Sequence, residues 1–175
     1  MQRTIKGVFL KNLVKVVEKQ KGPEGRVQLE EKFGDLNFSA FKDYSFECFG
    51  KIVASVCKVM YGENSPQAQF EIGKLMFEIY NKSVIGKTMF SLLGTNPKRA
   101  ALGAGRAMNT VTSGLDIEIA DLGPKKVKLR IKNDSQHIRH YEGVWAASAE
   151  MLNLKAKITA RELAPEDHEY IVEWE

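Results

Sequence analysis

The chain has 175 residues, a hydrophobic fraction of 43% and a net charge of +4. This length suits one domain with a substantial core, so we expect a single domain over residues 1–175. No segment has the roughly 18 uninterrupted apolar residues of a membrane-spanning helix. The apolar stretch at residues 7–10 ends at Lys11, which is too short for the core of a signal peptide. We therefore expect a protein that is not exported.

The two cysteines point to a reducing compartment. Cys48 and Cys57 lie nine residues apart in one predicted helix. At that spacing they point to opposite sides of the helix and cannot form a disulfide. A cytoplasmic location is the simplest interpretation.

Helical patterns fill the first part of the chain, residues 1–110. A stripe of apolar residues from Ile5 to Val16 predicts a helix that Gly22 ends, and Pro23 suits the first turn of the next one. The pairs Ser65-Pro66 and Asn96-Pro97 are typical of helix starts, with a polar cap followed by proline. The expected helices lie near residues 3–20, 23–33, 43–61, 66–80, 82–93 and 97–109.

A β-hairpin is predicted over residues 115–132, where apolar residues alternate with charged ones. Apolar residues alternate with acids over 115–121 and with bases over 126–132, and Gly123-Pro124 marks the turn. A pairing of Asp121 with Lys125 would place acidic side chains opposite basic ones along both strands. The further predicted pairs are Glu118 with Lys128 and Asp116 with Arg130.

The same charge pattern predicts a second hairpin near the C-terminus, between residues 155–162 and 169–175. Arg161 would lie opposite Glu169, Lys157 opposite Glu173 and Lys155 opposite Glu175. A helix near 136–153 links the two hairpins. The predicted fold class is therefore α+β, with an N-terminal helical part (1–110) followed by a small antiparallel sheet of β-β-α-β-β order (111–175).

This succession of elements resembles a family of uncharacterised bacterial domains known mainly from the Myxococcales and Deinococcus lineages. That family is similar to a wider group of haem-nitric-oxide-binding, vinyl-reductase-type and TRAPP-type domains. The resemblance implies a fold with a small antiparallel sheet and a role as sensor, ligand pocket or dimeric scaffold, and it implies no reaction. It is carried by Ile5-Lys6-Gly7-Val8-Phe9, the helix pair from Gly73 to Gly94, Asn96-Pro97-Lys98-Arg99, the strands of 115–132 and Tyr141-Glu142-Gly143-Val144.

The histidines argue against a haem or metal cofactor. A haem sensor of the related group would need an axial histidine on a helix before the sheet and a Tyr-x-Ser-x-Arg motif. The three histidines, His137, His140 and His168, all follow the first hairpin, and the motif is absent. His137 and His140 share one helix face, and we expect surface residues at a helix start there. The sequence therefore predicts no cofactor and no metal site.

Catalytic and nucleotide-binding motifs are also missing. The segment Gly103–Met108 resembles half a dinucleotide fingerprint, but its glycines lie inside a predicted helix, where they favour close packing instead. The small residues Gly143, Ala146, Ala147 and Ala149 are expected to give the last helix a thin face in the same way. Without a nucleophile elbow, a carboxylate pair or a phosphate loop, we expect a protein that is not an enzyme.

Two function hypotheses remain. The first is a ligand-binding or sensory module for a small apolar or lipid-like molecule, acting as a homodimer. A stripe of aromatic and methionine residues also fits a plain core, and only the family-level analogy favours a pocket. The candidate ligand-binding residues are Phe77, Tyr80, Met89, Phe90, Met108, Tyr141 and Trp145.

The alternative is a protein-interaction scaffold whose basic N-terminal helix contacts anionic lipid, nucleic acid or an acidic partner. Residues 1–21 contain six basic side chains against one acid, Glu18. Lys11, Lys15 and Lys19 lie off the apolar stripe and are the candidate polyanion-binding residues. A solvated helix face would show the same charge pattern.

Overall fold

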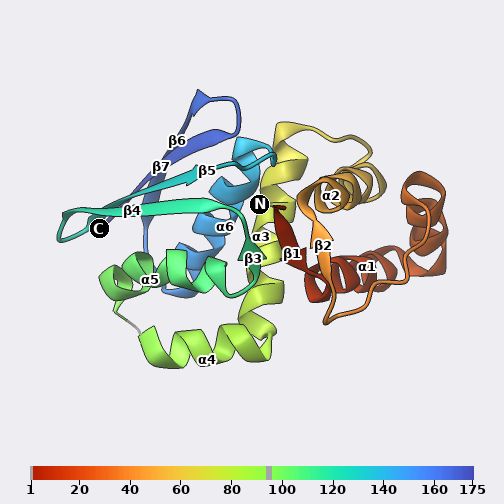
Figure 1. The fold of residues 1–175 in the computed structure, drawn as a ribbon, viewed down its shortest axis with the longest axis horizontal. Coiled ribbons are helices and arrows are strands. Elements are labelled where there is room, and N and C mark those ends of the chain that lie inside the picture. The colour runs from red at the N-terminus through yellow and green to blue at the C-terminus, as the bar shows by residue number, and fades with distance from the viewer. Residues whose placement is uncertain (1, 94–95) are drawn as a thin grey trace.

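The structure, a computed structural model, describes residues 2–93 and 96–175, without the side chains of residues 90 and 93. Figure 1 shows the larger sheet with α5 and α6 beside it at one end of the molecule, α1 and α2 at the other end, and α3 between the two ends. The helices in the described residues are α1 (Gly7–Phe33), α2 (Phe46–Tyr61), α3 (Pro66–Lys82), α4 (Val84–Leu93), α5 (Pro97–Asn109) and α6 (Ile138–Met151). None of these helices combines the length and the apolar character that a membrane crossing requires.

The strands in the described part of the chain form two separate sheets. The small one has the order β2-β1-β3, and the larger one has the order β4-β5-β7-β6 with every neighbouring pair antiparallel. The strands are β1 (Thr4–Lys6), β2 (Asp43–Ser45), β3 (Thr112–Ser113), β4 (Asp116–Gly123), β5 (Lys126–Lys132), β6 (Ala156–Ala164) and β7 (Asp167–Trp174). The predicted α+β class and the β-β-α-β-β order of the last part are confirmed.

The small sheet corrects two predicted helix starts. Residues 4–6 belong to β1, so the first helix begins at Gly7, and residues 43–45 belong to β2, so α2 begins at Phe46. Thr4 pairs with Ser45 on one side and with Ser113 on the other. Strands of three residues are too short to show an alternating pattern, and their partners lie about 40 and 110 residues away, which a local reading cannot detect.

The predicted helix ends and caps are confirmed. Gly22 interrupts α1 with a φ of +70°, and Pro23 follows it directly, so α1 consists of two helical pieces. The Ser65 side chain accepts a hydrogen bond from the Ala68 amide, and the Asn96 side chain accepts one from Arg99. These caps satisfy amides that a helix start leaves without partners.

The predicted register is correct in the second hairpin and wrong in the first. Arg161 pairs with Glu169 and Lys157 with Glu173, as the charges indicate. In the first hairpin Glu118 pairs with Arg130 and Asp116 with Lys132, two positions from the prediction. The turn causes the shift, because it lies at Pro124-Lys125 with Gly123 opposite Lys126, later in the chain than predicted. An irregularity between Asp121 and Gly123 then leaves Asp121 opposite Val127. A shift of two residues keeps every side chain on its predicted face.

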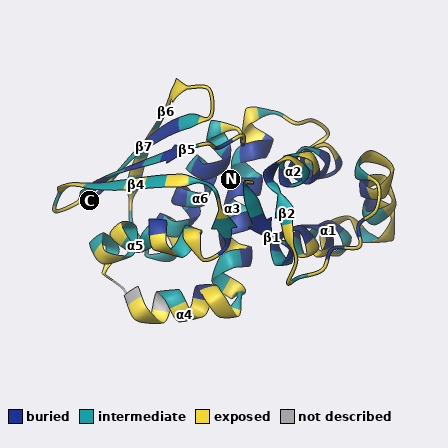
Figure 2. Cartoon of the chain, in the orientation of Figure 1, coloured by how far each residue is buried: buried dark blue, intermediate teal, exposed yellow. Residues whose placement is uncertain are grey.

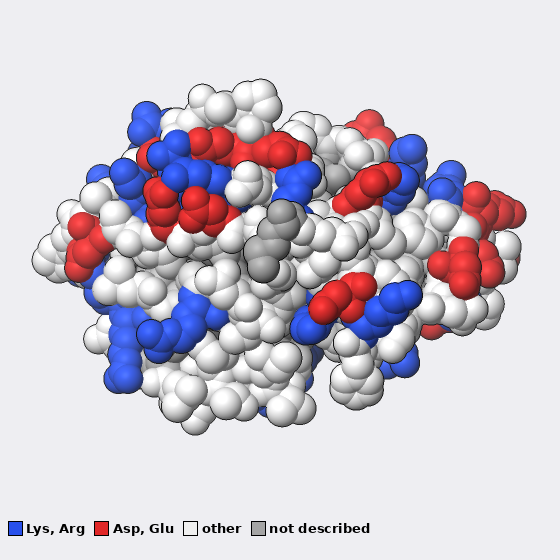
Figure 3. All heavy atoms as spheres, in the orientation of Figure 1, with Lys and Arg blue, Asp and Glu red and all other residues white. Residues whose placement is uncertain are grey.

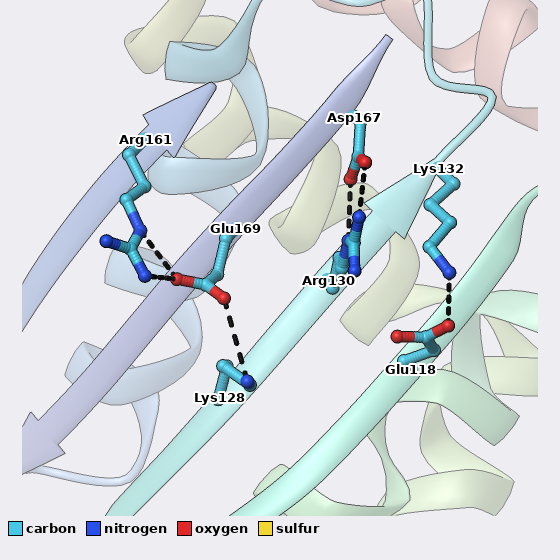
Figure 4. A network of polar contacts seen from close by, with 7 residues as sticks. All are labelled: Glu118, Lys128, Arg130, Lys132, Arg161, Asp167 and Glu169. Carbon is cyan, nitrogen blue, oxygen red and sulfur yellow. Dashed lines mark hydrogen bonds and ion pairs between the residues drawn. The ribbon is translucent and has the colours of Figure 1, made fainter. Parts of the chain in front are cut away.

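Figure 4 shows how charged side chains bridge neighbouring strands of the larger sheet. Glu169 accepts a hydrogen bond from Nε of Arg161 at 2.7 Å, forms an ion pair with Nη2 of the same residue at 2.5 Å and lies 3.7 Å from the Lys128 ammonium. Arg130 and Asp167 form a bidentate pair at 2.8 Å and 2.6 Å. Lys132 pairs with Glu118 across β4 and β5. Figure 3 shows basic and acidic side chains interleaved over this part of the molecule.

The apolar core has two clusters. One joins α1, α2 and α3 and includes the buried side chains of Leu13, Phe49 and Ile72. The other joins the larger sheet with α6 and includes Leu129 and Trp145. Figure 2 shows that α3 and α6 carry buried residues where the two clusters meet, whereas α4 is largely exposed.

Candidate functional site

An apolar cavity of about 160 Å³ lies between the helices and the larger sheet. Its lining comes from all six helices of the described residues, from β1, β3, β5 and β7, and from the segments that follow α5 and α6. No charged side chain contributes to the wall among the described residues. A space of this kind favours an apolar occupant, because polar molecules lose hydrogen bonds to water on entering it.

The structure brings together six of the seven candidate ligand-binding residues. The six that line the cavity are Phe77, Tyr80, Met89, Met108, Tyr141 and Trp145. The side chain of Phe90 lies outside the described residues. The sequence interpretation missed Ile5, Phe9 and Phe49, which reach the cavity from the N-terminal elements, and His140. Helical periodicity marks these residues as buried but does not reveal that they meet the later helices.

Alanines of α5 account for much of the open space. Ala100, Ala101, Ala104 and Ala107 all line the cavity. Gly105 lets this helix approach the sheet, because a Cβ there would lie 3.2 Å from Ile119 and 3.4 Å from Ile117. The close packing predicted for the Gly103–Met108 segment is therefore found at Gly105. The helix lies near the sheet but presents side chains too small to fill the gap.

Three aromatic side chains of α6 that carry polar atoms, His140, Tyr141 and Trp145, interrupt the apolar wall. Burial lowers the pKa of His140 to about 4, so its imidazole is neutral at neutral pH. Burial raises the pKa of Tyr141 well above its usual value, so the phenol keeps its proton. The site is therefore polar but carries no charge from these groups.

The expectation that the helix-start histidines lie on the surface is wrong for His140. This residue is only 2% exposed, and its ring packs edge-on against Phe49 at 5.8 Å. His137 is exposed, and its Nδ1 accepts a hydrogen bond from the Arg139 amide at the start of α6. The two residues differ because His137 stands before the first turn, whereas His140 lies on the face that packs against α2.

A second, polar cleft lies where the loop before α6 meets the β6–β7 hairpin. Asp134 is fully buried there, and its Oδ2 lies 3.4 Å from Nδ1 of His168. Its Oδ1 accepts a hydrogen bond from the Gln136 amide, and its own amide donates to the Glu166 carbonyl. Burial raises the pKa of Asp134, although the contact with His168 opposes this effect. The contacts of Asp134 fix the chain path into α6, which is a structural role.

Lys11, Lys15 and Lys19 are all exposed on α1, as predicted. They lie opposite Leu10, Leu13 and Val17, which face the core. None of the three makes an ion pair within residues 2–93 and 96–175, whereas the neighbouring Glu18 pairs with Arg26 at 2.5 Å. The arrangement leaves three adjacent positive charges in solvent.

The whole fold is that of the H-NOX domains. The H-NOX domain from Shewanella oneidensis, in its Fe(II)CO ligation state, superposes with a TM-score of 0.78 at 16% identity, covering 98% of this chain and 99% of that one. The Fe(II) unliganded H-NOX protein from K. algicida gives 0.73 at 11% identity, covering 98% and 97%. At sequence identities this low, the superpositions establish a shared fold only.

The chain itself belongs to the family described as "Protein of unknown function (DUF2378)", whose model matches residues 1–175. No curated protein matches it. The predicted resemblance to a family of uncharacterised domains related to haem-nitric-oxide-binding domains is therefore confirmed.

The residues of the cavity do not fit a haem. A volume of about 160 Å³ is close to the roughly 150 Å³ of a cavity that takes benzene, and well below the roughly 300–1,000 Å³ of pockets for drug-sized ligands. The two haem propionates would find no lysine or arginine among the described lining residues. His140 could supply one imidazole, but neither the space nor the charges of a haem site accompany it.

Proposed function

We propose that this chain is a non-enzymatic ligand-binding or sensory module that holds a small apolar molecule in the cavity between α5, α6 and the larger sheet. The apolar, uncharged lining of a space of about 160 Å³ carries this proposal. Cavities of similar volume and character take benzene-sized molecules. A cavity of this volume holds a short chain or a ring of a lipid-like ligand and is too small for a whole acyl tail.

Binding without catalysis is supported by the chemistry of the wall. The only serine among the described lining residues is Ser148, whose hydroxyl donates a hydrogen bond to the Trp145 carbonyl at 2.8 Å. A nucleophile needs a base within hydrogen-bond reach. No hydrogen bond in the described residues joins the His140 imidazole to a hydroxyl or thiol, so the cavity offers no activated nucleophile.

Toluene is a suitable probe, because it is slightly larger than benzene and carries no polar group. We expect it to shift the amide resonances of cavity residues and to raise the melting temperature of the protein. Replacing Ala104 by leucine should fill the space and abolish both effects. Ala164 is exposed and distant from the lining, so Ala164→Leu is the matched control and should bind toluene as the wild type does. Failure of toluene and benzene to bind at saturation in water would refute the proposal.

We also propose that the chain acts as a homodimer in the cytoplasm. Val84 and Leu92 of α4 are 82% and 64% exposed, and the surface over α4 shows few charges in Figure 3. Exposed apolar side chains of this kind favour association. Sedimentation should give twice the chain mass, and Val84→Lys with Leu92→Lys should give the monomer mass. A wild type that is monomeric at high micromolar concentration would contradict the dimer.

The scaffold hypothesis has one supporting observation. Lys11, Lys15 and Lys19 are exposed at intervals of four residues on α1, which places them on one side of the helix. A row of unpaired positive charges attracts anionic lipid or nucleic acid, and the attraction falls with added salt. This second function would act through a different surface from the cavity and can be tested separately.

A further inference from the structure

Two nitrogen atoms of the cavity wall have no hydrogen-bond partner among the described residues. Nδ1 of His140 and Nε1 of Trp145 are both buried without a hydrogen bond. The Tyr141 hydroxyl makes no hydrogen bond to any described residue either. The three side chains are 2%, 6% and 6% exposed, so bulk water does not reach them freely.

These three groups lie together on one helix. The rings of His140 and Tyr141 are 5.4 Å apart, and those of Tyr141 and Trp145 are stacked at 6.4 Å. All three side chains also line the same cavity, so one small molecule held there can contact each of them. Polar groups that are buried without partners destabilise a folded protein, so a cluster of them in one cavity indicates an occupant that satisfies them.

Their chemistry restricts that occupant. The indole Nε1 of Trp145 only donates, whereas the Tyr141 hydroxyl and the neutral His140 imidazole can each donate one hydrogen bond and accept another. An oxygen atom matches this set, because it accepts hydrogen bonds and, as a hydroxyl, also donates one. A carboxylate does not match, since no cation among the described lining residues offsets its charge.

We infer that the ligand is a small neutral molecule with an apolar body and one hydroxyl or carbonyl oxygen, which His140, Tyr141 and Trp145 hydrogen-bond at one side of the cavity. This inference rests on the proposed function, because it specifies the ligand of the same cavity. Ala104 and the other alanines of α5 would receive the apolar body. A hydrocarbon of equal size would leave the three polar groups without partners.

Phenol and toluene test this inference, because they have equal numbers of heavy atoms and differ by a hydroxyl in place of a methyl group. The measured quantity is the ratio of their dissociation constants in the wild type and in each variant. Tyr141→Phe and Trp145→Phe each remove a polar group and keep an aromatic ring. Each should shift the ratio against phenol by about 2- to 10-fold, the range expected for one neutral hydrogen bond.

Ala164→Leu is again the control, since Ala164 is exposed and outside the lining, and it should leave the ratio unchanged. The indole Nε1–H resonance of Trp145, assigned by its absence in Trp145→Phe, should move downfield with phenol and little with toluene. If the ratio of the phenol and toluene dissociation constants stays constant in both polar variants, the inference is overturned. Toluene binding in that case still upholds the proposed function. Failure of both molecules to bind the wild type would overturn the proposed function and this inference with it.

Discussion

Gly73 of α3 and Gly143 of α6 lie where the two helices cross, each directly against the backbone of the other helix. A Cβ on Gly73 would lie 1.8 Å from the His140 carbonyl oxygen, and one on Gly143 would lie 2.0 Å from that of Phe70. Real side chains never approach backbone so closely, so only glycine permits this crossing. The contact also sets the position of α6, which carries His140, Tyr141 and Trp145 of the cavity wall.

Replacing either glycine by alanine should therefore destabilise the fold. We expect Gly73→Ala and Gly143→Ala to lower the free energy of unfolding by about 1–3 kcal/mol or more, because the helices must separate. Gly50 in α2 is the matched control, since a Cβ there meets its nearest neighbour at 3.4 Å, an ordinary contact. Gly50→Ala should be neutral or stabilising by up to about 1 kcal/mol, because alanine favours the helix. Urea unfolding measures all three, and a Gly73→Ala variant as stable as wild type would contradict the close crossing.

The buried charge of Glu169 gives a second stability prediction. This carboxylate is 5% exposed and accepts hydrogen bonds from Arg161 while Lys128 lies close by (Figure 4). Glu169→Gln removes the charge and keeps the shape, so it should cost about 1–3 kcal/mol of unfolding free energy. Glu173 of the same strand pairs with Lys126 but is 56% exposed at its side chain, and Glu173→Gln should change stability by less than about 0.5 kcal/mol. Equal effects of the two substitutions in urea unfolding would show that burial does not strengthen the Glu169 interactions.

The basic row of α1 gives a prediction about polyanions. The triple variant Lys11→Gln, Lys15→Gln and Lys19→Gln should keep the fold, because all three side chains lie off the core. Its binding to vesicles with anionic lipid or to duplex DNA at low salt should fall steeply relative to wild type. A charge-matched control replaces the exposed Lys87, Lys125 and Lys155 by glutamine. If the control loses as much binding as the triple variant, net charge rather than the α1 row is responsible.

Sequence patterns predicted the elements whose signals are local. The serine–proline and asparagine–proline caps place α3 and α5 within about two residues of their observed starts, and alternating charges set the register of β6 on β7. The first hairpin was displaced because its turn lies at Pro124-Lys125, later in the chain than charge matching placed it. The strands β1 and β2 were missed because their pairing depends on residues distant in the chain.

The cavity was predictable only in part for the same reason. Helical spacing marks Phe77 and Trp145 as apolar-face residues, but it does not show that α5 brings alanines to the same place. The burial of His140 depends on Phe49 of α2, about 90 residues earlier in the chain. A histidine at the start of a helix usually reaches solvent, and only the crossing of α6 over α3 places this one in the core.

His140 also gives the protein a defined response to pH. Its pKa is about 4 in the folded protein, because burial disfavours the charged ring, and about 6.5 in the unfolded chain. The unfolded state therefore takes up a proton as the pH falls below about 6.5, while the folded state does not. The free energy of unfolding therefore falls as the pH decreases from about 6.5 to about 4, and the total loss is about 3 kcal/mol. Above about pH 6.5 this loss is absent.

Urea unfolding at pH 7.5 and at pH 4.5 measures this loss. We expect His140→Phe to be less sensitive than wild type to the change, because phenylalanine binds no proton in either state. His137→Asn measures the separate contribution of the neighbouring histidine, whose pKa burial also lowers, while asparagine can still cap α6. Comparing variants separates the effect from that of Asp134, whose pKa burial raises and whose contribution to the pH dependence has the opposite sign. If His140→Phe lost as much stability as wild type between the two pH values, the His140 imidazole would not be held neutral by burial.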